Sequence, residues 1–301
     1  MIQHPMEQQA MPAALDAAAL QRLRAWTGRS EEVHDDITAA PLRGWSATLD
    51  RADAPPRPGD VVPPLGHWLY FLPQAPQGEL GADGHPRRGG FLPPVPLPRR
   101  MWAGGRLVWH ADTPLRVGDA ARRVSRIESV SHKSGRSGEM VFVLVKHEVH
   151  HARGLALTEE HDIVYRGAPL AGATPPAPQA AEQQAPWRRQ IVPDPVLLFR
   201  YSALTFNGHR IHYDRRYVTE VEGYPGLVVH GPLIATLLVD LARRHVPGRL
   251  VRRFEFRAVR PTFDLHPFFV NGQPSVDGRV VRLWAHDHEG WLTVQGALEF
   301  E

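Results

Sequence analysis

Two short segments of the chain carry the residue types that proton-transfer chemistry needs. In the segment 201–214 an amide side chain, Asn207, stands five residues before an imidazole, His212. In Val229-His230-Gly231-Pro232 a glycine stands at the expected start of an apolar helix. An imidazole can take or return a proton near neutral pH, and a backbone N–H at a helix start can stabilise a developing oxyanion. Such groups together suit the addition of water to an acyl thioester, or its removal.

The elements that must position these groups are clearest in the C-terminal half. After Gly231-Pro232, apolar residues recur at helical spacing, and Pro247-Gly248 indicate the end of the helix. Alternation then predicts a strand in which Phe254, Phe256 and Ala258 face one way. Further strands are expected at 267–270, 279–285 and 291–300, with turns at Asn271-Gly272 and Glu289-Gly290. One long buried helix followed by this meander predicts a sheet wrapped around the helix.

The N-terminal half shows a weaker version of the same pattern. A helix is expected over 15–26, a strand over 66–72, and two long strands over 139–151 and 155–166. The segment 167–186 is rich in Ala, Pro, Gln and Gly and nearly lacks large apolar side chains, which is typical of a linker. We therefore expect an N-terminal domain at 1–166, a linker at 167–186 and a C-terminal domain at 187–301.

One motif resembles a zinc-protease site but is not expected to be one. His147-Glu148-Val149-His150-His151 satisfies HExxH, which binds metal only on a helix, where residues four apart share a face. Here it follows the β-branched run Val141-Phe142-Val143-Leu144-Val145, which predicts a strand. Residues four apart on a strand are separated by roughly 13 Å, too far to share one ion. We expect no metal site, and the chain also lacks a GxSxG elbow, a Walker loop and a GxGxxG motif.

The composition is that of a soluble globular protein. The chain has 301 residues, of which 43% are hydrophobic and 22% charged, with no stretch long enough to span a membrane and no secretion signal. It contains no cysteine, which fits a reducing cytoplasm and excludes thiol chemistry. The net charge of +3 comes from scattered arginines, so no nucleic-acid partner is implied. A polyanionic group such as coenzyme A would suit the surplus charge.

The segment 201–214 resembles the signature of the MaoC-like, or hydratase 2, family of hot-dog-fold enzymes. In that family an aspartate and, five residues later, a histidine flank the catalytic water, and a glycine amide binds the thioester carbonyl. The corresponding residues here are Asn207, His212 and Gly231. The change from aspartate to asparagine is similar to the branch called hydroxyacyl-thioester dehydratase type 2, and within it to mesaconyl-C4-CoA hydratases. The stretches 100–106 and 158–166 resemble the FAS1-like dehydratase domain that forms the N-terminal half of those enzymes.

The resemblance implies an α+β double hot dog, in which two antiparallel sheets each wrap a central helix and only the C-terminal copy carries the catalytic groups. His212 would move the proton, Gly231 would bind the oxyanion, and Asn207, which is no base at neutral pH, would position the water. Either His212 alone would then serve both carbons, or Asp214 or a substrate group would help. Further residues are expected to bind the substrate: His230, Val229, Tyr201, Phe206, Trp102, Arg100, Arg257 and Arg260.

The expected reaction is hydration of mesaconyl-C4-CoA to citramalyl-CoA, without a cofactor other than the coenzyme A of the substrate. Two alternatives remain open at this stage. One is a 3-hydroxyacyl-thioester dehydratase that acts on a fatty chain on coenzyme A or on acyl carrier protein. The other is a thioester-binding protein without turnover. A homodimer is also expected, because a hot dog leaves a sheet edge exposed.

Overall fold

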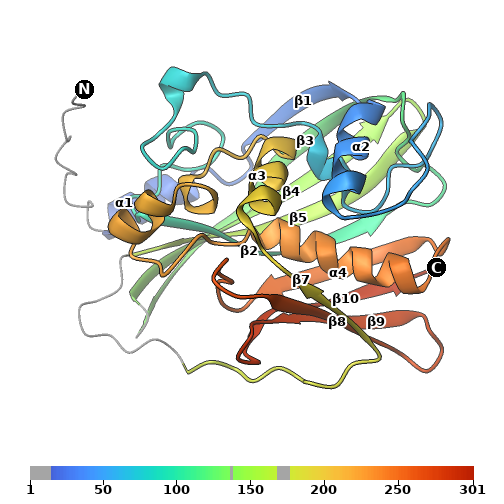
Figure 1. Ribbon diagram of the computed structural model, residues 1–301. Helices are drawn as coiled ribbons and strands as arrows, with labels where there is room; N and C mark the ends of the chain where they lie inside the picture. Colours follow the sequence, from blue (N-terminus) through green and yellow to red (C-terminus); the bar gives the residue numbers. More distant parts are fainter. Residues whose placement is uncertain (1–14, 136–137, 168–176) are drawn as a thin grey trace, which may run out of the picture.

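A computed structural model describes residues 15–135, 138–167 and 177–301. Ten strands form one antiparallel sheet in the order β1-β3-β4-β5-β2-β7-β10-β9-β8-β6, and the helices lie against it (Figure 1). The strands are β1 Ser30–Asp36, β2 Arg99–Trp109, β3 Ala120–Gly135, β4 Gly138–His151, β5 Gly154–Arg166, β6 Trp187–Ile191, β7 Val251–Ala258, β8 Phe268–Pro274, β9 Val280–His286 and β10 Leu292–Phe300. The helices are α1 Ala17–Arg24, α2 Ala39–Thr48, α3 Pro195–Leu204 and α4 Gly231–His245, with short helical turns η1 Gly66–Leu69, η2 Gln77–Glu79, η3 Arg210–His212 and η4 Tyr217–Val221.

The strand order contains an internal repeat. Read from its outer edge, each half of the sheet runs through its first, third, fourth, fifth and second strand, and the halves join where β2 pairs with β7. In each half a helix, α2 or α4, lies in the sequence between the first strand and the second. The glycine pair Gly104-Gly105 permits the junction, because a Cβ on Gly104 would lie 2.4 Å from the carbonyl oxygen of Phe256. The two copies thus share one continuous sheet.

The helix α4 is the core of the C-terminal half. All residues from Leu233 to Ala242 are buried, and the helix contacts β6, β8, β9 and β10, across which it lies in Figure 1. Its one buried charge, Asp240, pairs with Arg51 at 2.6 Å, Arg244 at 2.7 Å and Arg189 at 3.0 Å. Because Arg51 belongs to the N-terminal half, this ion-pair cluster joins the two halves.

Several sequence predictions are confirmed. The long strands expected at 139–151 and 155–166 are β4 and β5, and the helix expected after Gly231-Pro232 is α4. Phe254 and Phe256 of β7 are buried while Glu255 is exposed, as the alternation predicted. The HExxH pattern lies on a strand, β4. There His147 is buried and hydrogen-bonded to the Ser125 hydroxyl at 2.8 Å, as a core residue would be.

Two local predictions are wrong. The segment 66–72 forms the short helical turn η1, preceded by Leu65 with a φ of +68°, and it is buried without pairing to a strand. Asn271-Gly272 lies inside β8 and forms no turn. A Cβ on Gly272 would approach the Trp187 ring to 2.9 Å, so this glycine serves close packing. The turn comes later, where the Asp277 carboxylate accepts hydrogen bonds from Ser275 and from the Arg279 amide.

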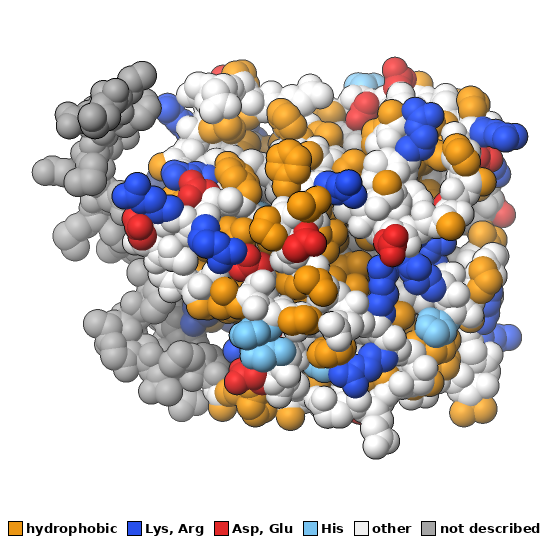
Figure 2. All heavy atoms as spheres, viewed as in Figure 1, with side chains coloured by type: hydrophobic (Ala, Val, Ile, Leu, Met, Phe, Trp, Pro, Cys, Tyr) orange, Lys and Arg blue, Asp and Glu red, His pale blue; other side chains and the backbone are white. Residues whose placement is uncertain are grey.

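The predicted helix at 15–26 is shorter in the structure, where α1 covers Ala17–Arg24. Residues 168–176 of the expected linker lie outside the described residues. No helix in the described ranges is both long and apolar enough to cross a membrane. On the face shown in Figure 2, lysine and arginine side chains stand singly or in small groups with acidic side chains among them.

Candidate functional site

The segment that follows α3 places the predicted catalytic residues. The Asp194 side chain caps α3 by accepting from the Leu197 amide at 2.8 Å, and the helix ends at Leu204. Phe206 then takes a left-handed φ of +49°, which turns the chain sharply. After this turn the Asn207 side-chain oxygen accepts a hydrogen bond from the His209 amide at 3.0 Å. Its side-chain NH2 makes no hydrogen bond to the described residues, which leaves two donors for a ligand.

His212 is held in one orientation and is buried. Its Nδ1 lies 2.6 Å from the Val228 carbonyl oxygen. A carbonyl only accepts, so Nδ1 carries the hydrogen and Nε2 is the basic nitrogen. The Val228 amide in turn donates to the Ile211 carbonyl at 3.0 Å, which ties the two segments together. Burial lowers the pKa of His212 from 6.5 to about 4, so the imidazole is neutral and can accept a proton at neutral pH.

His212 stacks directly on the residue that precedes α4. The ring centroids of His212 and His230 are 3.7 Å apart, with an interplanar angle of 18°. His230 is fully buried, and its Nε2 hydrogen-bonds the Ser202 hydroxyl at 2.8 Å. Burial is the main cause that lowers the pKa of His230, and the charge that His212 would carry adds to it. Two protonated rings in this stack would repel each other, so at most one proton is favoured here.

Gly231 is the first residue of α4, immediately after His230. The N–H of a first helical residue has no acceptor within its helix, and the helix dipole gives that end partial positive charge. A Cβ added to Gly231 would meet no atom within 4 Å, so the space beside its Cα is open. The His212 ring stacks on the residue that directly precedes Gly231, so the ring lies close to the start of α4.

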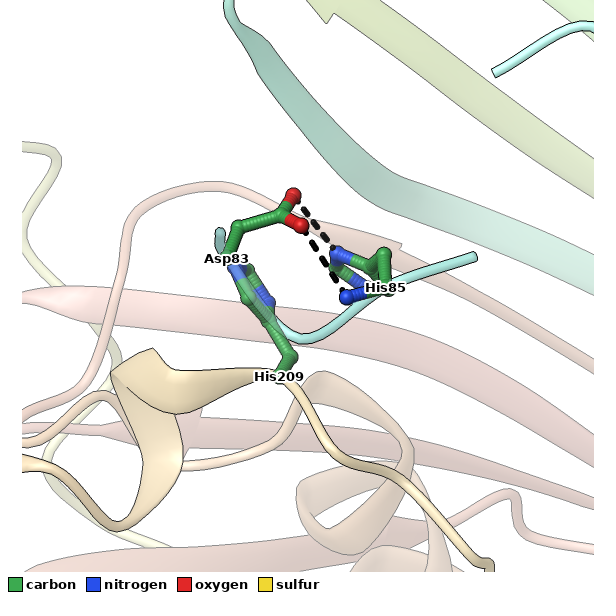
Figure 3. Close-up of side chains that lie close together, drawn as sticks. All are labelled: Asp83, His85 and His209. Atoms are coloured by element: carbon green, nitrogen blue, oxygen red, sulfur yellow. Dashed lines mark hydrogen bonds and ion pairs between the residues drawn. The ribbon is translucent and has the colours of Figure 1, made fainter. Parts of the chain in front are cut away.

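A loop of the N-terminal half also reaches this site, which sequence analysis missed (Figure 3). The Asp83 carbonyl accepts from the Arg210 amide at 2.9 Å. Gly84 has a φ of +86°, and its Cα packs so tightly on Gly208 that a Cβ would lie 1.9 Å from that carbonyl oxygen. The His85 ring consequently lies 4.0 Å from the His209 ring. The segment 78–98 is rich in Pro and Gly, and no motif in it points to these residues.

Asp83, His85 and His209 have donor atoms within 4.8 Å of one another, which is compatible with a metal ion (Figure 3). The other contacts of these three residues disfavour metal binding. The Asp83 carboxylate already accepts from the His85 ring at 3.1 Å and from the His85 amide at 3.0 Å. Three arginines and Asp83 line the adjoining cavity, so the local charge is positive and disfavours a cation. The donor set fits a metal poorly.

The electrostatics of this cluster favour neutral rings. Burial is the main cause that lowers the pKa of His85, the hydrogen bond to Asp83 opposes it, and the positive charge of Arg100 adds to the lowering. Burial also lowers the pKa of His209, followed by the charge of His85. Burial would raise the pKa of Asp83, yet the hydrogen bond with His85 keeps it below its ordinary value. At neutral pH the cluster therefore holds one carboxylate and two neutral imidazoles.

The residues predicted to bind substrate fall into two groups. Tyr201 lies beside the His230 ring, with centroids 5.1 Å apart, and Val229 directly precedes that histidine. Phe206 is exposed at the turn before Asn207. Arg100 lines the cavity beside His85.

The other predicted residues lie apart from the His212 ring. Trp102 packs in an aromatic cluster at the junction of the halves, 5.0 Å from Trp68 and 5.5 Å from Phe256 between ring centroids. Arg257 is exposed on β7. Arg260 lies 3.5 Å from the Asp287 carboxylate, so it is partly neutralised. None of these three contacts the His212–His230 stack within the described part of the chain.

Comparison with solved structures defines the class of fold. A MaoC-like dehydratase from Phytophthora capsici matches with a TM-score of 0.66 at 13% identity, over 94% of this chain and 97% of that one. A Mycobacterium tuberculosis protein described as having a double hotdog fold matches with a TM-score of 0.56 at 13% identity, over 91% and 96%. The predicted double hot dog is confirmed.

Sequence comparison then gives the family. The family described as hydroxyacyl-thioester dehydratase type 2 matches residues 65–264, and the chain belongs to this family. It is 51% identical over 255 residues to the mesaconyl-C(4)-CoA hydratase of Chloroflexus aurantiacus, covering 84% of this chain and 89% of the relative. It is also 27% identical to a mitochondrial hydroxyacyl-thioester dehydratase type 2 of Schizosaccharomyces pombe, over 67% and 74%. The chain is accordingly a hydro-lyase of acyl thioesters.

Proposed function

We propose that this enzyme adds water across the double bond of mesaconyl-C4-CoA to give citramalyl-CoA. The observation that carries the proposal is the stack of His212 on His230, which sets a neutral imidazole beside the open start of α4. The high identity to a hydratase of that name, over most of both chains, supports the choice of substrate. Removal of water from a 3-hydroxyacyl thioester is the reverse of the same chemistry.

In the proposed mechanism the thioester carbonyl accepts a hydrogen bond from the Gly231 amide. That contact stabilises the enolate oxygen that forms as water adds to the β-carbon, and the helix start supplies further positive potential. His212 takes the proton of the attacking water at Nε2, while its Nδ1–H keeps the ring fixed on Val228. The imidazolium so formed is buried and therefore acidic. It readily gives a proton to the α-carbon, so one histidine can serve both carbons.

Asn207 is assigned to orienting the water. Its side-chain oxygen is occupied by the His209 amide, so only the NH2 group can reach a ligand. An NH2 group can donate to the lone pairs of the water oxygen but cannot take its proton. Asp214 is a poor second base, because the Tyr217 amide and Arg210 hold its pKa below the ordinary range and pair its carboxylate. These contacts leave His212 as the proton carrier of the proposed site.

We further propose a homodimer in a cytoplasmic, reducing compartment, with no nucleic-acid partner and no metal. The sheet ends at β1 and β6, and an edge strand exposes unpaired backbone groups that a second copy could cover. The absence of cysteine fits a reducing compartment. Size-exclusion chromatography with light scattering tests the dimer, and a monomeric mass at assay concentration would contradict it.

The substrate proposal is tested by a panel of thioesters with wild type and His212→Ala. The panel contains mesaconyl-C4-CoA, crotonyl-CoA, a long-chain enoyl-CoA and the same long chain on acyl carrier protein. We expect the highest kcat/KM for mesaconyl-C4-CoA, and a fall of about 10²- to 10⁴-fold in His212→Ala with binding retained. Preference for the long chain would favour the fatty-acid dehydratase. Binding without turnover by wild type would favour a thioester-binding protein.

A further inference from the structure

The described part of the chain holds a cavity of about 210 Å³ beside the proposed catalytic site, for which the mechanism has no use. Its lining residues come from the loop 81–88, which packs against the segment that follows α3, and from the start of β2. Three of its lining side chains are arginines and one is a carboxylate, Asp83. Three arginines against one carboxylate give the cavity a net positive charge, which favours an anion.

One of the arginines, Arg88, is held in place by the cavity wall. The Arg88 guanidinium donates to the carbonyl oxygens of Val95, of Leu97 at 2.6 Å and of Pro98 at 2.8 Å. These acceptors fix its position without neutralising its charge. Arg100 has no carboxylate within salt-bridge distance in the described ranges 15–135, 138–167 and 177–301. Its charge is available for a ligand.

A buried hydroxyl beside Arg100 also lacks a partner. Tyr165 is directly opposite Arg100 in the pairing of β2 with β5. The tyrosine is fully buried, and its hydroxyl has no hydrogen-bond partner of ordinary geometry among the described residues, although Arg100 lies close enough to act on it as a donor. Burial raises the pKa of Tyr165, and the charge of Arg100 acts against that rise. A buried hydroxyl without a partner is costly, and the residue opposite it, Arg100, lines the cavity. A fork of guanidinium donors next to a phenol hydroxyl suits a carboxylate.

We propose that this cavity binds the free carboxylate of the acyl group, with Arg100 as its main partner and Arg88 as a fixed second charge. The inference rests on the proposed function. The position of the cavity favours the acyl carboxylate over the phosphates of coenzyme A as its ligand. His85 lines the cavity and contacts the His209 ring at 4.0 Å, which contacts the His212 ring at 5.4 Å. The cavity therefore lies at the acyl end, whereas the phosphates lie at the far end of the pantetheine arm.

The test compares three substrates with wild type, Arg100→Gln, Arg100→Lys and the control Arg252→Gln, which changes an exposed arginine on β7. Mesaconyl-C4-CoA has both the carboxylate and the phosphates, crotonyl-CoA lacks the carboxylate, and the pantetheine thioester of mesaconate lacks the phosphates. In Arg100→Gln we expect kcat/KM to fall about 10- to 100-fold for both mesaconyl thioesters, since a charged hydrogen bond is lost. The value for crotonyl-CoA should stay within about twofold of wild type, and the lysine variant should recover part of the loss.

The other outcomes are distinct. An equal fall with both coenzyme A substrates, absent with the pantetheine thioester, would overturn the proposal in favour of a phosphate site. Unchanged kinetics with all three substrates would overturn it as well, while leaving the proposed hydratase function intact. Failure of wild type to hydrate either mesaconyl thioester, with crotonyl-CoA turned over, would refute the proposed function and this inference with it. Retained activity on crotonyl-CoA reports that the variants are folded.

Discussion

The burial of His212 predicts a specific loss of stability in mild acid. Its pKa is about 4 in the folded chain and 6.5 in the reference state, so below pH 6.5 the unfolded chain binds a proton that the folded chain resists. Stability is therefore fully present above pH 6.5 and falls as the pH drops towards 4. Each pH unit in this window is worth about 1.4 kcal/mol. Between pH 7 and pH 5, the titration of His212 therefore lowers the free energy of unfolding by about 2 kcal/mol.

The assay is urea denaturation at pH 7 and pH 5, at fixed protein concentration, with wild type and His212→Asn. The asparagine amide can still donate to the Val228 carbonyl but does not titrate. We expect the free energy of unfolding to fall by about 2 kcal/mol less in His212→Asn than in wild type between the two pH values. The control His34→Asn changes an exposed histidine and should behave as wild type. Equal losses in wild type and His212→Asn would refute the reasoning.

Three further substitutions test the construction of the site. Gly231→Ala should keep the melting temperature of wild type, because its Cβ meets no atom within 4 Å. It should lower kcat/KM by about 10-fold or more, because the added methyl group crowds the substrate. Unchanged kinetics would show that the thioester binds elsewhere. Gly84→Ala should lower kcat/KM strongly, because its Cβ would lie 1.9 Å from the Gly208 carbonyl oxygen. The control Gly78→Ala, whose Cβ meets no atom within 4 Å, should keep the wild-type value. Equal activities of the two variants would show that this loop does not affect catalysis. Asp240→Asn should lower the free energy of unfolding by about 3 kcal/mol, since it removes the buried carboxylate that pairs with Arg189 and Arg244 and leaves Arg51 paired with Asp53 alone; a change below about 0.5 kcal/mol in a denaturation curve would contradict that role.

The sequence predicted elements where one periodicity runs long enough to exclude others. The apolar spacing after Gly231-Pro232 gave α4, and the alternation around Phe254 gave β7. It failed where packing decides the conformation. Gly272 reads as a turn residue, yet it lies inside β8 because Trp187 packs against it. The apolar run after Gly66 reads as a strand, yet no strand pairs with it in the described chain.

The same contrast between local sequence patterns and packing between distant segments applies to the proposed site. Asn207, His212 and Gly231 were expected from short segments that resemble a family signature, and the structure stacks His212 on the residue before Gly231. His85 could not be predicted, because its approach to His209 depends on the packing of Gly84 on Gly208, which are far apart in the sequence. Trp102 was expected to bind the substrate. In the structure it lies at the β2–β7 junction, where the glycine pair Gly104-Gly105 serves strand packing.

The most direct measurement is a crystal structure of His212→Asn with citramalyl-CoA bound. The account predicts that the thioester carbonyl oxygen lies about 3 Å from the Gly231 nitrogen and that the hydroxyl on the β-carbon faces the side chain at position 212. A product bound with its carbonyl away from the start of α4, or with its β-carbon in a different cavity from that side chain, would contradict it.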